Sequence, residues 1–472
     1  MLKKIDFGKN NREIVIPGVR IAEADFPAPF RSGLEYSSPA RGTWNIVHTG
    51  MLIPEAHEIY VCAAGCIRGV VLTAAEMGAS DRFSTVAVRE NNLLDGDMED
   101  LVVDGVTDII NKLPARPPAV LVHTSCVHHF TGVDLDMIYS KLRERFPDID
   151  FADCYMNPIM RKSGLTPDQL MRSRLYMLLK RRPADRSAVA IVGSDLPTRE
   201  DSDLKKLLAG AALKTREITS CKTYEEYQQM AESTVFISNY PDAVPGADML
   251  AERLEAVHFH LPFSFDPDEI DEGLKQLSQI LAANCEPAKA ADSYYLAELE
   301  SVVDSIISEG RSACTEAFEE TLSLIGDTPI AIDYTYCPRP LSLARMLLDK
   351  GFNVSRVYLD SIPARDKPDF DYLQQNYPDL MLRPTVHAAM RFAHAAADCT
   401  QNHCRPQMLA IGQKAAYFEN TENFVNIVEG GGMNGYEAIT GTLGLMRDAF
   451  LHKKPVRDLI QIKGLGCEVC IR

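Results

Sequence analysis

Short apolar runs alternate with amphipathic segments along most of this chain. The runs are rich in Val, Ile and Ala and are too short for typical helices, a pattern that indicates strands buried on both faces of a parallel sheet. The predicted strands cover residues 59–61, 119–122, 150–153, 188–192, 234–238, 330–332, 354–359, 407–411 and 424–428.

The segments between these runs carry apolar residues at intervals of three and four, the spacing of one helix face. We predict helices at residues 67–77, 98–113, 135–146, 166–180, 201–213, 224–233, 246–254, 269–283, 293–324, 341–350 and 436–449. Gly310 is expected to break the longest of them, because glycine is a poor helix former. The stretch Glu90–Asp97, E-N-N-L-L-D-G-D, is expected to form a turn, because it combines Asn, Asp and Gly.

Strands that alternate with helices in this way indicate parallel sheets covered by helices. The chain has 472 residues, more than one hydrophobic core usually supports. We therefore predict an α/β protein with three Rossmann-like domains, whose mainly parallel sheets are sandwiched by helices. The predicted domains are residues 1–185, 186–305 and 306–472.

Charge and composition narrow the class of partner. The formal net charge of −17 disfavours sequence-independent nucleic-acid binding, which needs clustered Lys and Arg against phosphate. The N-terminus lacks the apolar centre of a signal peptide, and no stretch approaches the ~18 consecutive apolar residues of a membrane span. The twelve cysteines suit a reducing compartment better than a disulfide framework. We expect a cytoplasmic protein that binds neither nucleic acid nor membrane.

Three cysteines follow two of the predicted strands. Cys62 and Cys66 come after the strand at 59–61, and Cys126 comes after the strand at 119–122. The carboxyl ends of parallel strands share one edge of a sheet, where ligands bind. Thiols that converge there in a reduced protein suggest a metal centre, and soft sulfur ligands match the iron of an iron–sulfur cluster.

Two other interpretations of these cysteines stay open. A buried cysteine is often only a small apolar side chain. Zinc is the other metal, because His123, His128 and His129 flank Cys126 and zinc accepts mixed Cys and His ligands. A radical-type C-x3-C-x2-C motif is disfavoured, since Gly69 stands where its third cysteine would be.

Two segments carry a resemblance to nitrogenase component 1 proteins. V-C-A-A-G-C, ending at Cys66, is similar to their H-G-P-x-G-C turn. V-H-T-S-C-V-H-H-F-T-G-V-D-L-D, around Cys126, is similar to their S-x-C-x-x-x-x-G-D-D segment. The resemblance implies a cluster held by first-domain cysteines where two homologous subunits meet. The family's earliest ligand cysteine would fall near residues 37–40, which hold none, so Cys62 is expected to replace it as the third thiolate of a [4Fe–4S]-type cluster.

The resemblance also bears on a second site. The metal cofactor of true nitrogenases is held by a second-domain Cys and a third-domain His, and here Ser238 and Asn434 stand at the matching positions. Dinitrogen reduction with that cofactor is therefore not expected, and the pocket would take another cofactor or a substrate. Gly432 belongs to a G-x-G-x-x-G run that precedes a predicted helix. We expect this run to line a substrate or cofactor pocket and not to bind a nucleotide. Arg339, after a third-domain strand, is a further pocket candidate for an acidic substrate.

The sequence thus predicts the iron–sulfur subunit of a nitrogenase-like reductase. As the resemblance implies, electrons would come from an ATP-dependent iron protein and pass through a cluster at Cys62, Cys66 and Cys126 to the pocket. The chain has no G-x4-G-K-[ST] motif, so ATP would be hydrolysed on that separate donor. Expected partners are the donor and a homologous subunit or second copy. The alternatives are an assembly scaffold of the same family and a zinc- or small-molecule-binding α/β protein without a redox role.

Overall fold

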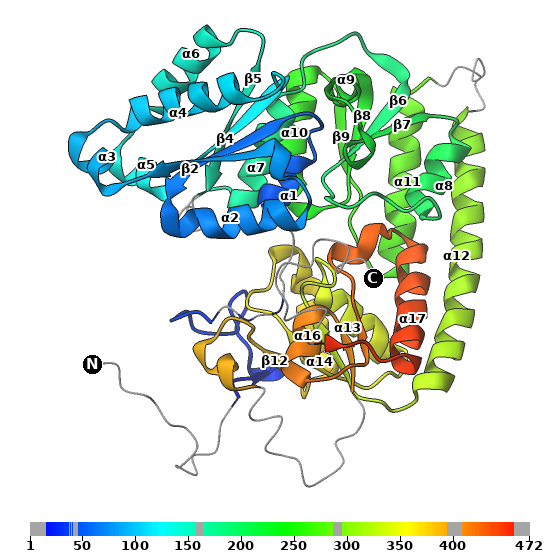
Figure 1. The fold of residues 1–472 in the computed structure, drawn as a ribbon. Helices are drawn as coiled ribbons and strands as arrows, with labels where there is room; N and C mark the ends of the chain where they lie inside the picture. The colour runs from blue at the N-terminus through cyan, green and yellow to red at the C-terminus, as the bar shows by residue number, and fades with distance from the viewer. Residues whose placement is uncertain are drawn as a thin grey trace, which may run out of the picture. The chain divides into compact units, whose positions relative to one another are not determined.

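A computed structural model describes residues 16–36, 38, 40, 46–156, 164–286, 295–393 and 408–456 of the chain. Within these residues there are three β-sheets, and the chain divides into two compact units (Figure 1). Unit 1 takes the described residues up to Ala40, those from Ala317 to Val428 and those from Thr442 onward. Unit 2 takes those from Ile46 to Glu316 and from Glu429 to Gly441.

The first sheet of unit 2 has four parallel strands in the order β3-β2-β4-β5. Its strands are β2 (His57–Ala63), β3 (Phe83–Val88), β4 (Ala119–Ser125) and β5 (Asp150–Met156). The chain passes from β2 to β3 on one side and then to β4 on the other side of β2. The strand order therefore reverses between β2 and β4, and ligands of doubly wound sheets bind at the carboxyl ends of the strands at such a reversal.

Helices cover both faces of this sheet. They are α1 (Ile46–Met51), α2 (Ala64–Glu76), α3 (Glu90–Asp95), α4 (Met98–Lys112), α5 (Cys126–Thr131), α6 (Leu135–Arg145) and α7 (Pro167–Met177). Val102 of α4 and Leu142 of α6 pack with Val61 and Val122 on one face. Helices α1 and α2 pack on the other face, around Tyr60. Successive buried side chains of β2 point to opposite faces of the sheet, because the side chains of a strand have a two-residue period.

The second sheet repeats the strand order of the first, as β7-β6-β8-β9, and is also parallel. Its strands are β6 (Asp185–Val192), β7 (Lys214–Glu217), β8 (Ser233–Ser238) and β9 (Val257–His260). The helices of this segment are α8 (Asp203–Gly210), α9 (Tyr224–Gln229), α10 (Val244–Leu254), α11 (Pro267–Asn284) and the long α12 (Tyr295–Ile325). Here the strand order reverses between β6 and β8.

One hydrophobic core joins the first and second sheets. Leu175 and Tyr176 of α7 pack in a single cluster with Leu121 of β4, Phe236 of β8 and Leu250 of α10. Figure 1 shows α7 and α10 between the two sheets. Because these helices bury apolar surface on both sides, the first two predicted domains lie in one compact unit.

Unit 1 contains a six-stranded sheet in the order β1-β12-β11-β10-β13-β14. Its strands are β1 (Val19–Arg20), β10 (Ile330–Asp333), β11 (Val354–Tyr358), β12 (Met381–Arg383), β13 (Leu409–Ile411) and β14 (Phe424–Val425). The helices are α13 (Pro340–Asp349), α14 (Lys367–Asn376), α16 (Gln413–Glu419) and α17 (Tyr436–Leu451), the last from Thr442 onward. All pairings are parallel except that of β1 with β12.

The predicted fold class, α/β with mainly parallel sheets between helices, is confirmed. The pairing of Val19 with Leu382 puts the start of the described chain in the sheet of the third predicted domain, and not in that of the first. The boundaries at residues 185 and 305 stay predictions. Among the described residues, no helix combines the length and apolar character needed to cross a bilayer.

Two local predictions were wrong. Glu90–Asp95 forms the helix α3, because the Asn92 side chain accepts the backbone N–H of Arg89 at 3.0 Å and Gly96, at φ 69°, ends the helix. Helix α12 continues through Gly310, where an added Cβ would lie 2.5 Å from the ring of Tyr436. Gly310 therefore allows a close contact and does not break the helix.

Candidate functional site

The three predicted cysteine ligands lie at the point where the strand order of the first sheet reverses. Cys62 is near the end of β2, and Cys66 is in the first turn of α2, which follows directly. Cys126 is the first residue of α5, directly after β4. Strands β2 and β4 are neighbours in register, with Val61 opposite Thr124. The topology therefore brings the thiols to one edge.

The thiols differ in exposure. Cys62 is buried, Cys126 is half-buried and Cys66 is exposed, and all three are free. Burial, and to a smaller extent electrostatic repulsion from Cys66 and Cys126, raises the pKa of the Cys62 thiol to about 12. This mutual influence requires the three sulfur atoms to be near one another. A shared centre would lie at the protein surface, with Cys62 as its innermost ligand.

The histidines beside Cys126 have other partners. Nδ1 of His128 accepts the backbone N–H of Ser125 at 3.1 Å, and the ring of His123 stacks on Tyr60 with centroids 4.0 Å apart. Across the described residues, no three His, Cys, Asp or Glu side chains are arranged to hold a metal ion. Three thiolates are soft ligands of the kind that hold iron–sulfur clusters, and they also suit zinc.

A buried wall lies behind Cys62. Glu58, Tyr60 and His123 are fully buried, and Oε2 of Glu58 lies 3.8 Å from Nε2 of His123. Burial raises the pKa of Glu58 well above its usual value and lowers the pKa of His123 to about 3. His123 is therefore neutral at pH 7, and burial favours the protonated, neutral form of Glu58.

The second sheet has a different constellation at its carboxyl edge. Oγ of Ser238, the last residue of β8, lies 2.8 Å from Nε2 of His258 and 3.0 Å from Nδ1 of His260. Nδ1 of His258 lies 2.6 Å from Oδ1 of Asp248 on α10. The two histidines are two residues apart on β9, so they share one face of the strand.

A buried arginine supports the same edge. Arg172 of α7 lies 3.0 Å from Oδ1 of Asp195, and it also donates to the carbonyl oxygen of Gly193, just after β6. Its guanidinium stacks on the ring of Tyr240 at 4.6 Å. Arg172 is 2% exposed, so these partners replace the water that the charge has lost.

Gly432 and Asn434 lie in a loop that packs against the segment after β6. A Cβ on Gly432 would lie 2.1 Å from the carbonyl oxygen of Pro197, and one on Gly435 would lie 2.5 Å from Oδ2 of Asp203. The glycines therefore permit a close backbone approach. Asn434 is 1% exposed, and among the residues that the structure describes its side-chain amide has no hydrogen-bond partner.

The fourth predicted pocket residue, Arg339, belongs to unit 1. Its guanidinium lies 3.2 Å from Oδ1 of Asp366 and 2.8 Å from Oδ2 of Asp369, and all three side chains are buried. Burial raises the pKa of Asp366 to about 7 although Arg339 lowers it. The charge of Arg339 is thus matched within its own unit, and its role toward an acidic substrate stays a prediction.

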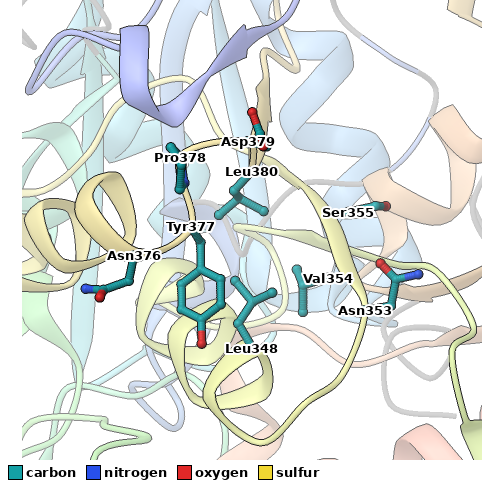
Figure 2. A pocket seen from close by; sticks show the side chains of 9 residues that line it. All are labelled: Leu348, Asn353, Val354, Ser355, Asn376, Tyr377, Pro378, Asp379 and Leu380. Carbon is teal, nitrogen blue, oxygen red and sulfur yellow. The ribbon is translucent and has the colours of Figure 1, made fainter.

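Figure 2 shows a cavity of about 410 Å³ in unit 1. It lies at the amino ends of β11 and β12, opposite the edge where ligands of such sheets bind. It is lined by Leu348, Asn353, Val354, Ser355, Asn376, Tyr377, Pro378, Asp379 and Leu380. None of the predicted pocket residues is among them.

Sequence reasoning missed Asp248 and Arg172. Asp248 and His258 are ten residues apart in the sequence and meet where α10 packs on β9. No short sequence motif predicts a contact at that spacing. Arg172 lies in an ordinary amphipathic helix, where an arginine normally faces water. Near residues 37–40, the described Ser38 and Ala40 are buried in unit 1, and Ser37 lies outside the described residues.

The doubly wound sheets and the thiols at a reversal of strand order define an α/β protein with a candidate metal centre. The chain belongs to the family of nitrogenase component 1 type oxidoreductases, whose family model matches residues 47–429. This confirms the resemblance drawn from the motifs around Cys66 and Cys126.

The fold agrees with solved structures. The chain is similar to one described as "Nitrogenase Cp1 at pH 6.5", with a TM-score of 0.62 and 14% identity over 89% of this chain and 94% of that chain. It is also similar to "Nitrogenase Cp1 at pH 5", with a TM-score of 0.58 and 11% identity over 90% of each chain. At these identities the likeness shows the fold alone. No curated protein matches the sequence.

Proposed function

We propose that this chain is the iron–sulfur subunit of a nitrogenase-like reductase that takes electrons from an ATP-dependent iron protein. The observation that carries the proposal is the meeting of Cys62, Cys66 and Cys126 at one edge of the first sheet. A [4Fe–4S]-type cluster bound there supplies one-electron transfer. Family membership supports the redox class. Ser238, Gly432 and Asn434 remain the proposed lining of a substrate or cofactor pocket in unit 2, and Arg339 of unit 1 remains a proposed contact of an acidic substrate.

The chain's own residues set the conditions for such a cluster. Cys62 offers a ligand from the buried side, and Cys66 and Cys126 offer ligands nearer the surface. Behind them, His123 is neutral and burial favours the neutral form of Glu58. Burial is one of the factors that tune a cluster's potential. Three thiolates leave one iron for a ligand from a partner.

The surface around the thiols supports a protein partner. Helices α2, α3 and α5 each begin at the carboxyl edge of the first sheet, and they carry five exposed large apolar side chains. These residues, called the apolar rim below, are Val71, Leu72, Leu93, Leu94 and Phe130. Exposed large apolar side chains on helices that begin at a candidate site support an interaction surface there. We propose that a homologous subunit or second copy covers the apolar rim.

Anaerobic purification of the full-length chain tests the metal. We expect iron and inorganic sulfide with an EPR signal after reduction, and reductase activity only when an iron protein and ATP are added. Zinc without iron would contradict the proposal. Iron without turnover would favour the assembly scaffold, an alternative supported by Ser238 and Asn434 at the positions where the resemblance expects cofactor ligands.

The apolar rim is tested by assembly state. The double variant Leu94→Lys/Phe130→Lys replaces side chains that are 86% and 68% exposed, so the monomer should keep its fold. We expect the oligomer to dissociate at protein concentrations where the unmodified chain stays assembled, as measured by analytical ultracentrifugation. Met177→Lys is the matched control, because Met177 is exposed on α7 at the end remote from the thiol edge. Equal assembly of the double variant and the unmodified chain would exclude the rim as the interface.

A further inference from the structure

A continuous line of four hydrogen-bonding side chains runs from helix α10 along one face of the second sheet. It runs from Asp248 on α10 to His258 and Ser238, and ends at His260, with consecutive atoms 2.6, 2.8 and 3.0 Å apart. All three separations lie within hydrogen-bond range. The line starts at the surface, because the Asp248 side chain is 63% exposed, and its middle is buried, because that of His258 is 5% exposed and Ser238 is fully covered.

The chemistry of the middle residue gives the line a direction. A serine hydroxyl has one proton, so Ser238 donates to one imidazole and accepts from the other. Ionised Asp248 only accepts, so it holds the proton of His258 on Nδ1 and leaves Nε2 as an acceptor. Ser238 then donates to His258 and accepts from Nδ1 of His260. When Asp248 is protonated, it donates to Nδ1 of His258, and donor and acceptor then change places in each of the other two hydrogen bonds.

We propose that Asp248, His258, Ser238 and His260 form a proton relay between solvent and the carboxyl edge of the second sheet. The inference rests on the proposed reductase function, since each electron delivered to a substrate there must be matched by a proton. Release of one proton from Nε2 of His260 shifts each internal proton by one hydrogen bond and leaves Asp248 ionised. Water at the exposed carboxylate then resupplies one proton, and each imidazole must exchange its Nδ1 proton for one on Nε2 before the next transfer. One proton enters, one leaves, and no electron moves within the relay.

The same atoms resemble the Ser, His and Asp set of a hydrolase, but one feature favours the relay. The Ser238 hydroxyl is shared with a second imidazole, which a nucleophile does not need and a relay does. Ser238 therefore links two proton carriers.

Histidine-selective ¹⁵N NMR of the full-length protein tests the relay without any assay of turnover. The ring nitrogens are assigned from His258→Gln and His260→Gln spectra. Asp248→Asn removes the charge that orients the line, so at constant pH we expect the tautomer of His260 to shift from Nδ1–H toward Nε2–H. In a Ser238→Ala background, the same substitution should leave His260 unchanged. Glu252→Gln is the matched control, because it removes an exposed carboxylate one turn further along α10 and should move neither histidine.

The outcomes are distinct. A response of His260 that needs both Asp248 and Ser238 supports the relay. No response, or an equal response without the Ser238 hydroxyl, overturns it, and Asp248 is exposed enough that misfolding of its variant is not the explanation. Rapid covalent labelling of Ser238 by a fluorophosphonate would assign a nucleophile in its place. If His260 responds to Asp248 through Ser238 but the protein binds no iron, the relay stands and the proposed reductase function is wrong.

Discussion

The first and second sheets of unit 2 have the same strand order and differ in what they place where that order reverses. The first sheet presents three thiols, one of them exposed, in front of a buried wall. The second presents a buried hydroxyl between two imidazoles, supported by a buried ion pair between Arg172 and Asp195. Topology therefore sets where chemistry can occur, and a few side chains decide which chemistry it is. Soft sulfur suits electron transfer, and the hydroxyl and imidazoles suit proton transfer.

The largest expected effect is the loss of iron from the carboxyl edge of the first sheet. Cys66→Ser replaces a proposed thiolate ligand by a hard hydroxyl, so we expect iron affinity to fall on the order of tenfold or more. Metal analysis of anaerobically purified protein measures the change. Cys221→Ser is the matched control, because Cys221 is a half-buried free cysteine in the segment of the second sheet. Equal iron in both variants would remove Cys66 from the ligand set.

The position of the thiols could be predicted from the sequence, because a parallel sheet has only one edge to which its strands' carboxyl ends lead. Helices with a clear apolar face, such as α4 and α6, were predicted to within one residue at each end. Strand β3, Phe83–Val88, was missed because it lies at the sheet edge and its residues are only partly buried, which weakens its apolar pattern.

The chemistry of the second edge could be predicted only in part. The spacing of His258 and His260 on one strand placed them on one face, which requires only the period of a strand. Their link to Asp248 depends on how α10 docks on β9, which no local pattern determines. The buried pair Arg172–Asp195 joins α7 to the turn after β6 and likewise exists only in the assembled fold.

The next largest effect is expected from removing the buried charge of Arg172. In Arg172→Met, Asp195 keeps a hydrogen bond from Thr49 at 3.1 Å but loses its cation, so we expect a loss of about 3–5 kcal/mol of unfolding free energy. Urea unfolding measures it. Arg145→Met on α6 is the control: Arg145 pairs with Asp104 at 2.8 Å while 43% exposed, and such surface pairs contribute about 0–1 kcal/mol. Similar losses in the two variants would show that Arg172 is not the support of this edge.

The glycine-rich loop beside the second edge gives a smaller effect. Gly435→Ala forces a side chain into a backbone with φ 72° and against Oδ2 of Asp203, which accepts the Tyr436 N–H. We expect a loss of about 2–4 kcal/mol, from about 1–2 for the left-handed backbone and the rest from the close contact. Gly444→Ala in α17 has open space around the added carbon and should gain up to about 1 kcal/mol. Thermal and urea unfolding of the pair compare the two, and a neutral Gly435→Ala would mean that the loop is not held against Asp203.

The smallest effect concerns the pH dependence of stability at the same loop. Burial raises the pKa of Glu437 from 4.5 to about 7, although Arg199 at 3.1 Å lowers it. Between these two values the folded chain retains a proton that the unfolded chain has released. The folded state therefore binds more protons, and its stability must fall as pH rises from about 4.5 to about 7.

Glu437→Gln removes this titration and keeps the shape of the side chain. We expect the stability lost between pH 5 and pH 8 to be smaller in the variant by about 1–3 kcal/mol, because each unit of pKa shift corresponds to ~1.4 kcal/mol. Urea unfolding at the two pH values measures the difference, with Glu252→Gln as an exposed control that should follow the unmodified chain. If the second edge instead tolerates an ionised Glu437 beside Arg199, both variants will show the same pH dependence. The carboxyl edges of the two sheets would then differ more, because the second would keep a buried carboxylate charged whereas burial favours the neutral form of Glu58 behind the first.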